Sequence, residues 1–217
     1  MPGFPQTTEL NRRIPKQKFY ENLSLTPLVK RGFVEGIKLI YWRNKLAEDT
    51  VHIPKGEQVT EIEVFEIRLS GPTLDEAVLR QIDKEIPYHI LFLLTFEGKV
   101  QAWIGYKEAS FGVKSFKVNR YYHTDWMQED ELPLHLEGLS LDAVYENLVR
   151  QIAGDALEQT TSGSLAADIE HQQRREKLQK EIARLEKLAW AEKQPKRKFE
   201  LAQMVAEQKR MLKEIVI

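Results

Sequence analysis

The residue with the strongest catalytic potential in this sequence is His123, which lies two residues before the carboxylate of Asp125 in an aromatic stretch, 121–126. A carboxylate in this position orients an imidazole that acts as a general base. The five histidines show none of the i, i+3 or i+4 spacings of a helical metal site. His89 falls inside an apolar run, which is typical of a buried, hydrogen-bonded histidine.

No second catalytic group accompanies His123. The sequence has no cysteine, which excludes thiol nucleophiles, thiolate metal sites and disulfides, and neither GxxxxGK[ST] nor GxGxxG occurs. Glu97-Gly98-Lys99 matches the ExK half of a metal-dependent nuclease core, but it reads as a turn and no acid precedes it in 88–96. We therefore predict no catalytic residue, metal or cofactor. The alternative is a divergent nuclease or other hydrolase that uses His123 and Asp125 with Glu66 or Glu97.

Charge is segregated along the chain, although the formal net charge is −1. Residues 12–45 have a balance of +7, residues 46–167 of −11 and residues 168–217 of +4. Basic clusters of this kind are typical of nucleic-acid surfaces. The alternatives are that the N-terminal stretch docks on the acidic middle of the chain, and that both clusters are solvated. The predicted nucleic-acid-binding residues are Arg12, Arg13, Lys16, Lys18, Lys30, Arg31, Lys196, Arg197 and Lys198.

The elements that position these residues follow from hydrophobic periodicity. Thr26-Pro27 and the apolar residues after it predict a helix over 27–43. Strands are predicted over 60–69, 88–96, 99–107 and 115–123, with a tight turn at Glu97-Gly98. A capping box at 73–76 begins one helix, and Ser140 begins another. Aromatic residues in these elements either stack nucleobases or, as is usual in strands, fill the core: Trp42, Tyr88, Trp103, Tyr106, Tyr121, Tyr122 and Trp126.

This order of elements predicts an α+β fold with a mixed or mainly antiparallel sheet of about four to five strands flanked by helices. Residues 1–158 form that domain, 159–167 a linker, and 168–217 an antiparallel, coiled-coil-like helical hairpin with heptad spacing in both arms. The hairpin covers the domain's own core, binds a second protein or a second copy, or binds nucleic acid directly. The predicted partner-binding residues are Leu178, Ile182, Leu185, Leu201, Val205 and Leu212.

Composition indicates a folded protein outside the membrane. Hydrophobic residues make up 42% of the chain, enough for a sizeable core. The N-terminus lacks the apolar region of a signal peptide, and no run is long enough for a membrane-spanning helix. We expect a soluble, cytoplasmic protein.

Six phrases in the sequence resemble one bacterial family, domain of unknown function 4391: IPKQKFY (14–20), YWRNKLA (41–47), EVFEI (63–67), IPYHIL (86–91), WIGYKE (103–108) and LEGL (136–139). The resemblance runs from about residue 5 to the end of the chain. It implies a neighbour of helicases and modification methyltransferases in restriction-type defence clusters, and it supplies no catalytic residues. We therefore predict a non-enzymatic accessory protein that binds DNA, a helicase or methyltransferase, or another copy of itself through its C-terminal helices.

Overall fold

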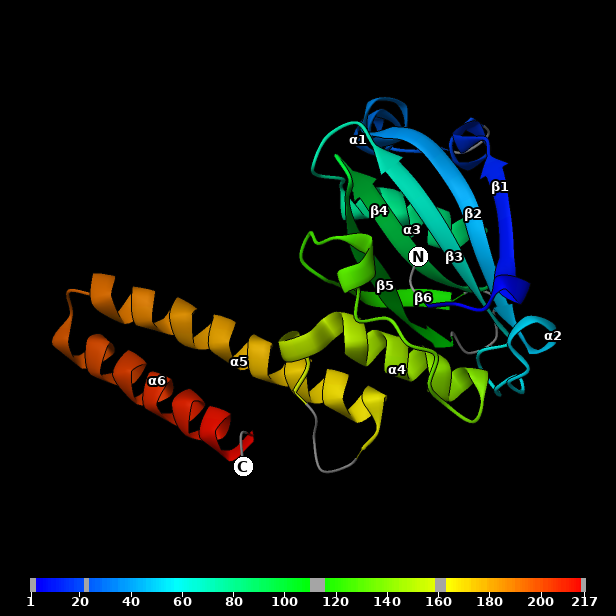
Figure 1. Cartoon of the computed structure of the whole chain (residues 1–217). Coiled ribbons are helices and arrows are strands. Elements are labelled where there is room, and N and C mark those ends of the chain that lie inside the picture. Colours follow the sequence, from blue (N-terminus) through cyan, green and yellow to red (C-terminus); the bar gives the residue numbers. More distant parts are fainter. Residues whose placement is uncertain (1–2, 22–23, 110–115, 159–162, 216–217) are drawn as a thin grey trace. The chain divides into compact units, whose positions relative to one another are not determined.

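The chain folds into two units, which are described separately (Figure 1). The computed structural model describes residues 3–21, 24–109, 116–158 and 163–215. The first unit, Met1–Gly154, contains a six-stranded sheet, and the second, Asp155–Ile217, contains two long helices. Four of the nine residues of the predicted linker 159–167, residues 159–162, lie outside the described residues.

The sheet of the first unit is mixed, and its strands follow the order of the chain. Each pairs antiparallel with its neighbour, except that β3 and β4 are parallel and are joined through helix α3, Glu76–Glu85. The predicted α+β class is confirmed, with six strands in place of four to five. The strands are β1 Glu9–Ile14, β2 Ile37–Ala47, β3 Glu61–Leu69, β4 His89–Phe96, β5 Lys99–Ala109 and β6 Phe116–His123.

The two additional strands lie in the N-terminal region, and β2 replaces residues 37–43 of the predicted helix 27–43, so the prediction was wrong beyond Gly36. Thr26 caps Val29 as expected, but helix α1 is only Pro27–Arg31, followed by a π-helical turn, Gly32–Gly36. From Ile37 the chain pairs with β3 over eleven residues. A bulge between Trp42 and Asn44 breaks the strand's alternation, which hid it in the sequence.

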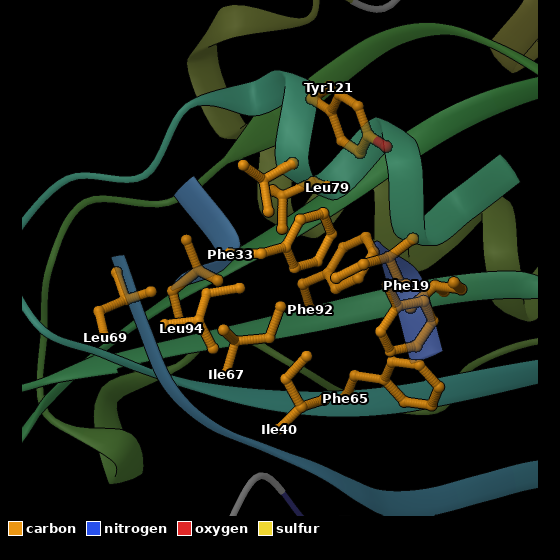
Figure 2. Packing of buried hydrophobic residues seen from close by; sticks show 14 of the residues in the cluster. Phe19, Phe33, Ile40, Phe65, Ile67, Leu69, Leu79, Phe92, Leu94 and Tyr121 are labelled. Atoms are coloured by element: carbon orange, nitrogen blue, oxygen red, sulfur yellow. The ribbon is translucent and has the colours of Figure 1, made fainter. Parts of the chain in front are cut away.

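One face of the sheet packs against α3 and the N-terminal turns (Figure 2). Helix α3 begins at Glu76, inside the predicted capping box 73–76. Its N-cap is Asp75, whose carboxylate accepts a hydrogen bond from the Ala77 N–H. Leu79 of this helix, Phe33 and the strand residues Phe65 and Phe92 meet in one buried cluster. Gly32 is required at this contact, because a β-carbon there would come within 2.5 Å of a Val78 methyl group.

The opposite face is covered by α4, Leu141–Ala153. Its Tyr145 ring packs edge-on against His89, with 4.3 Å between the ring centroids. Since side chains alternate along a strand, His89, Leu91 and Leu93 lie on this face and Ile90, Phe92 and Leu94 on the other. β4 is therefore buried on both sides, as its continuous apolar sequence predicts.

Shorter elements complete the first unit. The β4–β5 turn at Glu97 and Gly98 has positive φ at both residues, which is the geometry of a two-residue hairpin turn. The remaining short helices of this unit are η1 Gln6–Thr8, η2 Lys16–Phe19, α2 Glu48–Val51 and η4 Glu129–Glu131, and η5 Gly154–Ala156 begins at its last residue.

The second unit is a hairpin of two packed helices, α5 Leu165–Ala191 and α6 Pro195–Ile215. α5 begins inside the segment 159–167, so the last residues predicted as linker are helical. Among the helices of the described residues, none is long and apolar enough to cross a membrane.

Candidate functional site

His123 ends β6 and has a partner other than Asp125. Its ring stacks on Trp103 with 4.4 Å between centroids, and its Nδ1 lies 3.0 Å from the Thr124 carbonyl oxygen and 3.2 Å from Gln101 Nε2. The surroundings of this imidazole are thus a tryptophan and two amide groups, which hold the ring in place.

The other residues of the hydrolase alternative lie elsewhere in the sheet. Glu66 is in β3, and because β4 and β5 separate it from β6, it is about 14 Å from the strand of His123 at ordinary strand spacing. The Glu66 carboxylate binds Arg43 and Arg68. Glu97 lies in the β4–β5 turn. The structure does not bring Glu66 together with His123.

The predicted basic residues of the N-terminal stretch fall into two groups. Lys16 is structural, because its Nζ donates to the carbonyl oxygens of Val34 (2.9 Å) and Ile37 (2.5 Å), and burial lowers its pKa. Arg31 forms an ion pair of 2.6 Å with Glu35. Arg31 is nevertheless exposed, as are the four others: Arg12, Arg13, Lys18 and Lys30.

The turn of the α5–α6 hairpin, residues 190–199, forms a second basic surface, which we call the tip. Lys196, Arg197 and Lys198 are all exposed there, as is Lys193. Arg197 Nε lies 3.6 Å from a Glu192 carboxylate oxygen, a long and exposed ion pair. The tip therefore presents a compact positive charge.

Two large aromatic side chains accompany these cations, and the sequence analysis missed them. Trp190 is 87% exposed and Phe199 is 64% exposed. Both lie next to the heptad positions but not on them, since Trp190 follows Ala189 and Phe199 precedes Leu201 by two residues. An aromatic residue outside the heptad positions and close to a run of basic residues is the feature of the sequence that indicates an exposed ring.

The apolar seam between α5 and α6 contains the predicted partner-binding residues. Ile182 and Leu185 are buried, and the other four are half-buried: Leu178, Leu201, Val205 and Leu212. Part of the seam is open, because a cavity of about 680 Å³ lies between the helices, next to Leu178, Gln208 and Met211. Binding of a partner to the remaining apolar surface stays a prediction.

A further cavity, of about 400 Å³, lies in the first unit and was not predicted. Ile14 of β1, Trp42 of β2 and Phe65 of β3 line it on the sheet side. Lys18 of η2 and Tyr88, just before β4, line it from the flanking segments. Two of the aromatic residues from the sequence analysis, Trp42 and Tyr88, thus border a hollow, whereas Tyr121 and Tyr122 are buried.

A buried carboxyl group, that of Glu63, also lines this cavity. Glu63 is only 3% exposed and accepts a hydrogen bond from Trp42 Nε1. Burial, followed by the hydrogen bond and charge of neighbouring Glu61, raises its pKa to about 9. Glu61 in turn pairs with Lys45, at 3.1 Å. Glu63 is therefore a neutral carboxylic acid at pH 7, able both to donate and to accept a hydrogen bond.

A buried ion pair next to Tyr88 stabilises the segment that lines this cavity. Lys107 Nζ of β5 lies 2.7 Å from Asp83 Oδ1 of α3, and both side chains are about 1% exposed. Tyr121 donates to the second oxygen of Asp83, and Lys107 also donates to the carbonyl of Tyr88. The network connects α3, β5 and β6, and it holds the backbone of the cavity residue Tyr88.

No group of three or more histidine, aspartate or glutamate side chains that could hold a metal ion occurs in the described part of the chain. The mixed six-stranded sheet and the helical hairpin define an α+β protein, and each unit has a candidate binding surface: the aromatic cavity with its carboxyl group in the first and the basic tip in the second.

The chain belongs to the family described as Domain of unknown function (DUF4391), whose sequence profile matches residues 3–212. The resemblance found in the sequence is therefore confirmed over almost the whole chain. Comparisons with curated proteins and with solved structures found no match.

Proposed function

We propose that this protein is a non-enzymatic accessory protein that binds single-stranded DNA through the tip of its helical hairpin. The observation that carries the proposal is the combination, within residues 190–199, of four exposed cations and two exposed aromatic rings. The proposal keeps the setting implied by the family resemblance, a DNA-processing or restriction-type defence system with a helicase or methyltransferase as partner.

The tip has both kinds of contact that single-stranded nucleic acid uses. Lysine and arginine side chains neutralise phosphates and release their counterions. Exposed aromatic rings stack on bases, and a single strand offers unpaired bases for this. Trp190 and Phe199 give the tip this second contact, while Lys196, Arg197 and Lys198 supply the first.

A purely solvated tip explains the lysines but not the rings. Leaving most of a tryptophan in water forgoes about 1.5–3 kcal/mol of burial for a large apolar side chain. Exposed aromatic residues beside cations are instead enriched at binding surfaces. Since Trp190 and Phe199 lie on either side of the helix turn, a strand crossing the tip contacts both helices.

The test is the salt dependence of binding to a fluorescent single-stranded oligonucleotide. In the triple variant Lys196→Gln/Arg197→Gln/Lys198→Gln, the slope of log affinity against log salt should fall by about 0.7 for each phosphate that the variant no longer neutralises. In Trp190→Ala/Phe199→Ala the slope should stay unchanged while the affinity drops roughly 10- to 100-fold.

A matched control removes the same charge from exposed positions outside the tip: Lys177→Gln/Lys180→Gln/Lys213→Gln. This variant should retain most of the affinity. The proposal is refuted if the protein has no affinity at low salt, or if the control and the tip variants weaken binding equally.

A further inference from the structure

We infer that the cavity lined by Trp42 and Glu63 binds a nucleotide, with the base against the aromatic side chains and the phosphate at the cationic rim. This site is in the first unit and uses no residue of the tip, so it goes beyond the function proposed above. Its volume of about 400 Å³ is within the ordinary range of small-ligand pockets.

The walls of the cavity suit a flat ring. Trp42 and Phe65 meet edge to face on the sheet, with 6.5 Å between their ring centroids. Phe19 of η2 and Tyr88 line the cavity from the flanking segments, and Tyr88 is 37% exposed. Aromatic surfaces of this kind bind nucleobases by stacking, without requiring one particular base.

The carboxyl group of Glu63 suits the edge of a base. A neutral carboxyl presents one donor and one acceptor side by side, and every nucleobase has an adjacent donor and acceptor on its Watson–Crick edge. Glu63 is held in its neutral form by burial and by Glu61, and its position is fixed by the bond from Trp42 Nε1. Before a ligand arrives, the Glu63 proton is bonded to Glu61 and one Glu63 oxygen accepts from Trp42, so a base must replace the bond to Glu61 in order to use the donor.

The rim carries the charge that a phosphate needs. Lys18 lines the cavity and is exposed. Arg12 is the register partner of Trp42, and Ile14, two residues later on the same face of β1, lines the cavity. Arg12 therefore lies beside the cavity without lining it, and the exposed charged residues of the lining itself are Lys18 and Glu85.

The same rim argues against an organic cation as the ligand. Aromatic pockets with acidic groups also bind quaternary ammonium ions. Here the buried acid, Glu63, is neutral and does not attract a cationic ligand. Lys18 in the lining and Arg12 beside it repel such a ligand, and Glu85 in the lining partly offsets that repulsion. The charges favour a ligand that is neutral at its inner end and anionic at its outer end.

The experiment is isothermal titration calorimetry, which measures the affinity of the full chain for AMP, GMP, CMP and UMP, and for adenosine. We expect binding of the mononucleotides, and a roughly 10- to 100-fold loss of affinity in Trp42→Leu. Lys18→Ser changes an exposed side chain and leaves the fold intact; it should reduce the preference for AMP over adenosine, with Arg12 left to provide the remainder. Lys38→Ser, which removes an exposed lysine that does not line this cavity, is the matched control.

A base can reach this cavity as a free nucleotide or as part of a strand, so a second arm uses a single-stranded oligonucleotide. Mononucleotide binding that depends on Trp42 and Lys18 supports a free nucleotide as the ligand. This arm is carried out in the Trp190→Ala/Phe199→Ala variant. If only oligonucleotide binding depends on Trp42 and Lys18 there, the ligand of the cavity is a nucleotide within a single strand. The tip variant separates this inference from the proposed function, since it should bind mononucleotides normally.

Two results overturn the inference. One is the absence of mononucleotide binding together with oligonucleotide affinity that is unchanged in both Trp42→Leu and Lys18→Ser. The other is binding of tetramethylammonium in preference to all four mononucleotides.

Discussion

Two buried side chains, Glu63 and His89, are both kept neutral by the fold, and their pKa values move in opposite directions. Burial, together with the hydrogen bond and charge of Glu61, raises the pKa of Glu63 from 4.5 to about 9. Burial, together with the positive charge of Lys107, lowers the pKa of His89 from 6.5 to about 3. Each group therefore binds a different number of protons in the folded and unfolded states, which makes stability depend on pH.

The sign of each effect sets a distinct pH window. Above pH 4.5 the unfolded state ionises Glu63 while the folded state keeps its proton, so stability falls as pH rises towards 9. Below pH 6.5 the unfolded state protonates His89 while the folded state does not, so stability falls as pH drops towards 3. Between pH 4.5 and 6.5 the two contributions oppose each other.

We predict that Glu63→Gln flattens the alkaline side of this profile. Urea unfolding between pH 6.5 and 8.5 should show the wild type losing up to about 1.4 kcal/mol per pH unit relative to the variant. The charged groups around Glu63 that remain in both proteins are Glu61, Lys45, Lys18 and Glu85. Equal slopes in both proteins would contradict the assignment.

The burial of His89 can be predicted from the sequence, but the burial of Glu63 cannot. A histidine within the run 88–96 indicates a buried imidazole, and His89 is indeed 2% exposed. Glu61 and Glu63 alternate along a strand and so resemble an ordinary solvated face. Only the folded chain places Trp42 over Glu63, because that contact depends on the register between β2 and β3 and on the bulge after Trp42.

At the scale of elements, α4 stabilises an irregularity in β5. The pairing of β5 with β6 shifts between Tyr106 and Lys107. The Tyr145 hydroxyl accepts a hydrogen bond from the Lys107 N–H (3.1 Å) and donates one to the Gly105 carbonyl oxygen (2.5 Å). One side chain of α4 thus binds two backbone groups at the bulge, which would otherwise be buried without partners.

We predict that Tyr145→Phe lowers the free energy of unfolding by about 1–3 kcal/mol, the cost of leaving buried backbone groups unpaired. Tyr20→Phe is the control, because it keeps a ring packed on Phe33 at 5.6 Å and leaves β5 untouched. Chemical denaturation of both variants measures the difference. A decrease no greater than that of the control would show that the hydroxyl has no structural role.

The successes and failures of element prediction have physical causes. The β4–β5 hairpin was predictable, because Glu97-Gly98 takes a turn that favours glycine and β4 is continuously apolar. The predicted helix 27–43 was wrong from Ile37 onward, because Ile37 and Ile40 belong to β2, which pairs with β3, and their spacing from Phe33 resembles a helical stripe only by coincidence. Tertiary pairing of β2 with two neighbouring strands outweighs that local pattern.

At the scale of the whole molecule, the two units differ in how much apolar surface they bury. The sheet has a core on both faces, whereas the part of α5 that pairs with α6 buries little beyond Ile182 and Leu185. The stability of the hairpin therefore depends on each of these few apolar contacts, since intrinsic helix propensity alone stabilises helices only weakly in water.

We therefore predict that Ile182→Asp/Leu185→Asp unfolds the hairpin and leaves the first unit folded. Circular dichroism should show a loss of helical signal with the main thermal transition retained, and trypsin should cleave within α5 and α6. Gln179→Asp/Ala183→Asp, at exposed positions of the same helix, is the control. Disappearance of the main transition in the seam variant alone would show that the first unit needs the hairpin to fold.

The strand order of the sheet also has a consequence for synthesis. Because β1 to β6 lie side by side in chain order, each strand leaving the ribosome finds its partner already made. Pairing between these six strands therefore never waits for a distant segment, and the parallel step from β3 to β4 is bridged by the α3 crossover. The sheet is thus suited to assembly while the polypeptide is still being translated, with the hairpin emerging after it.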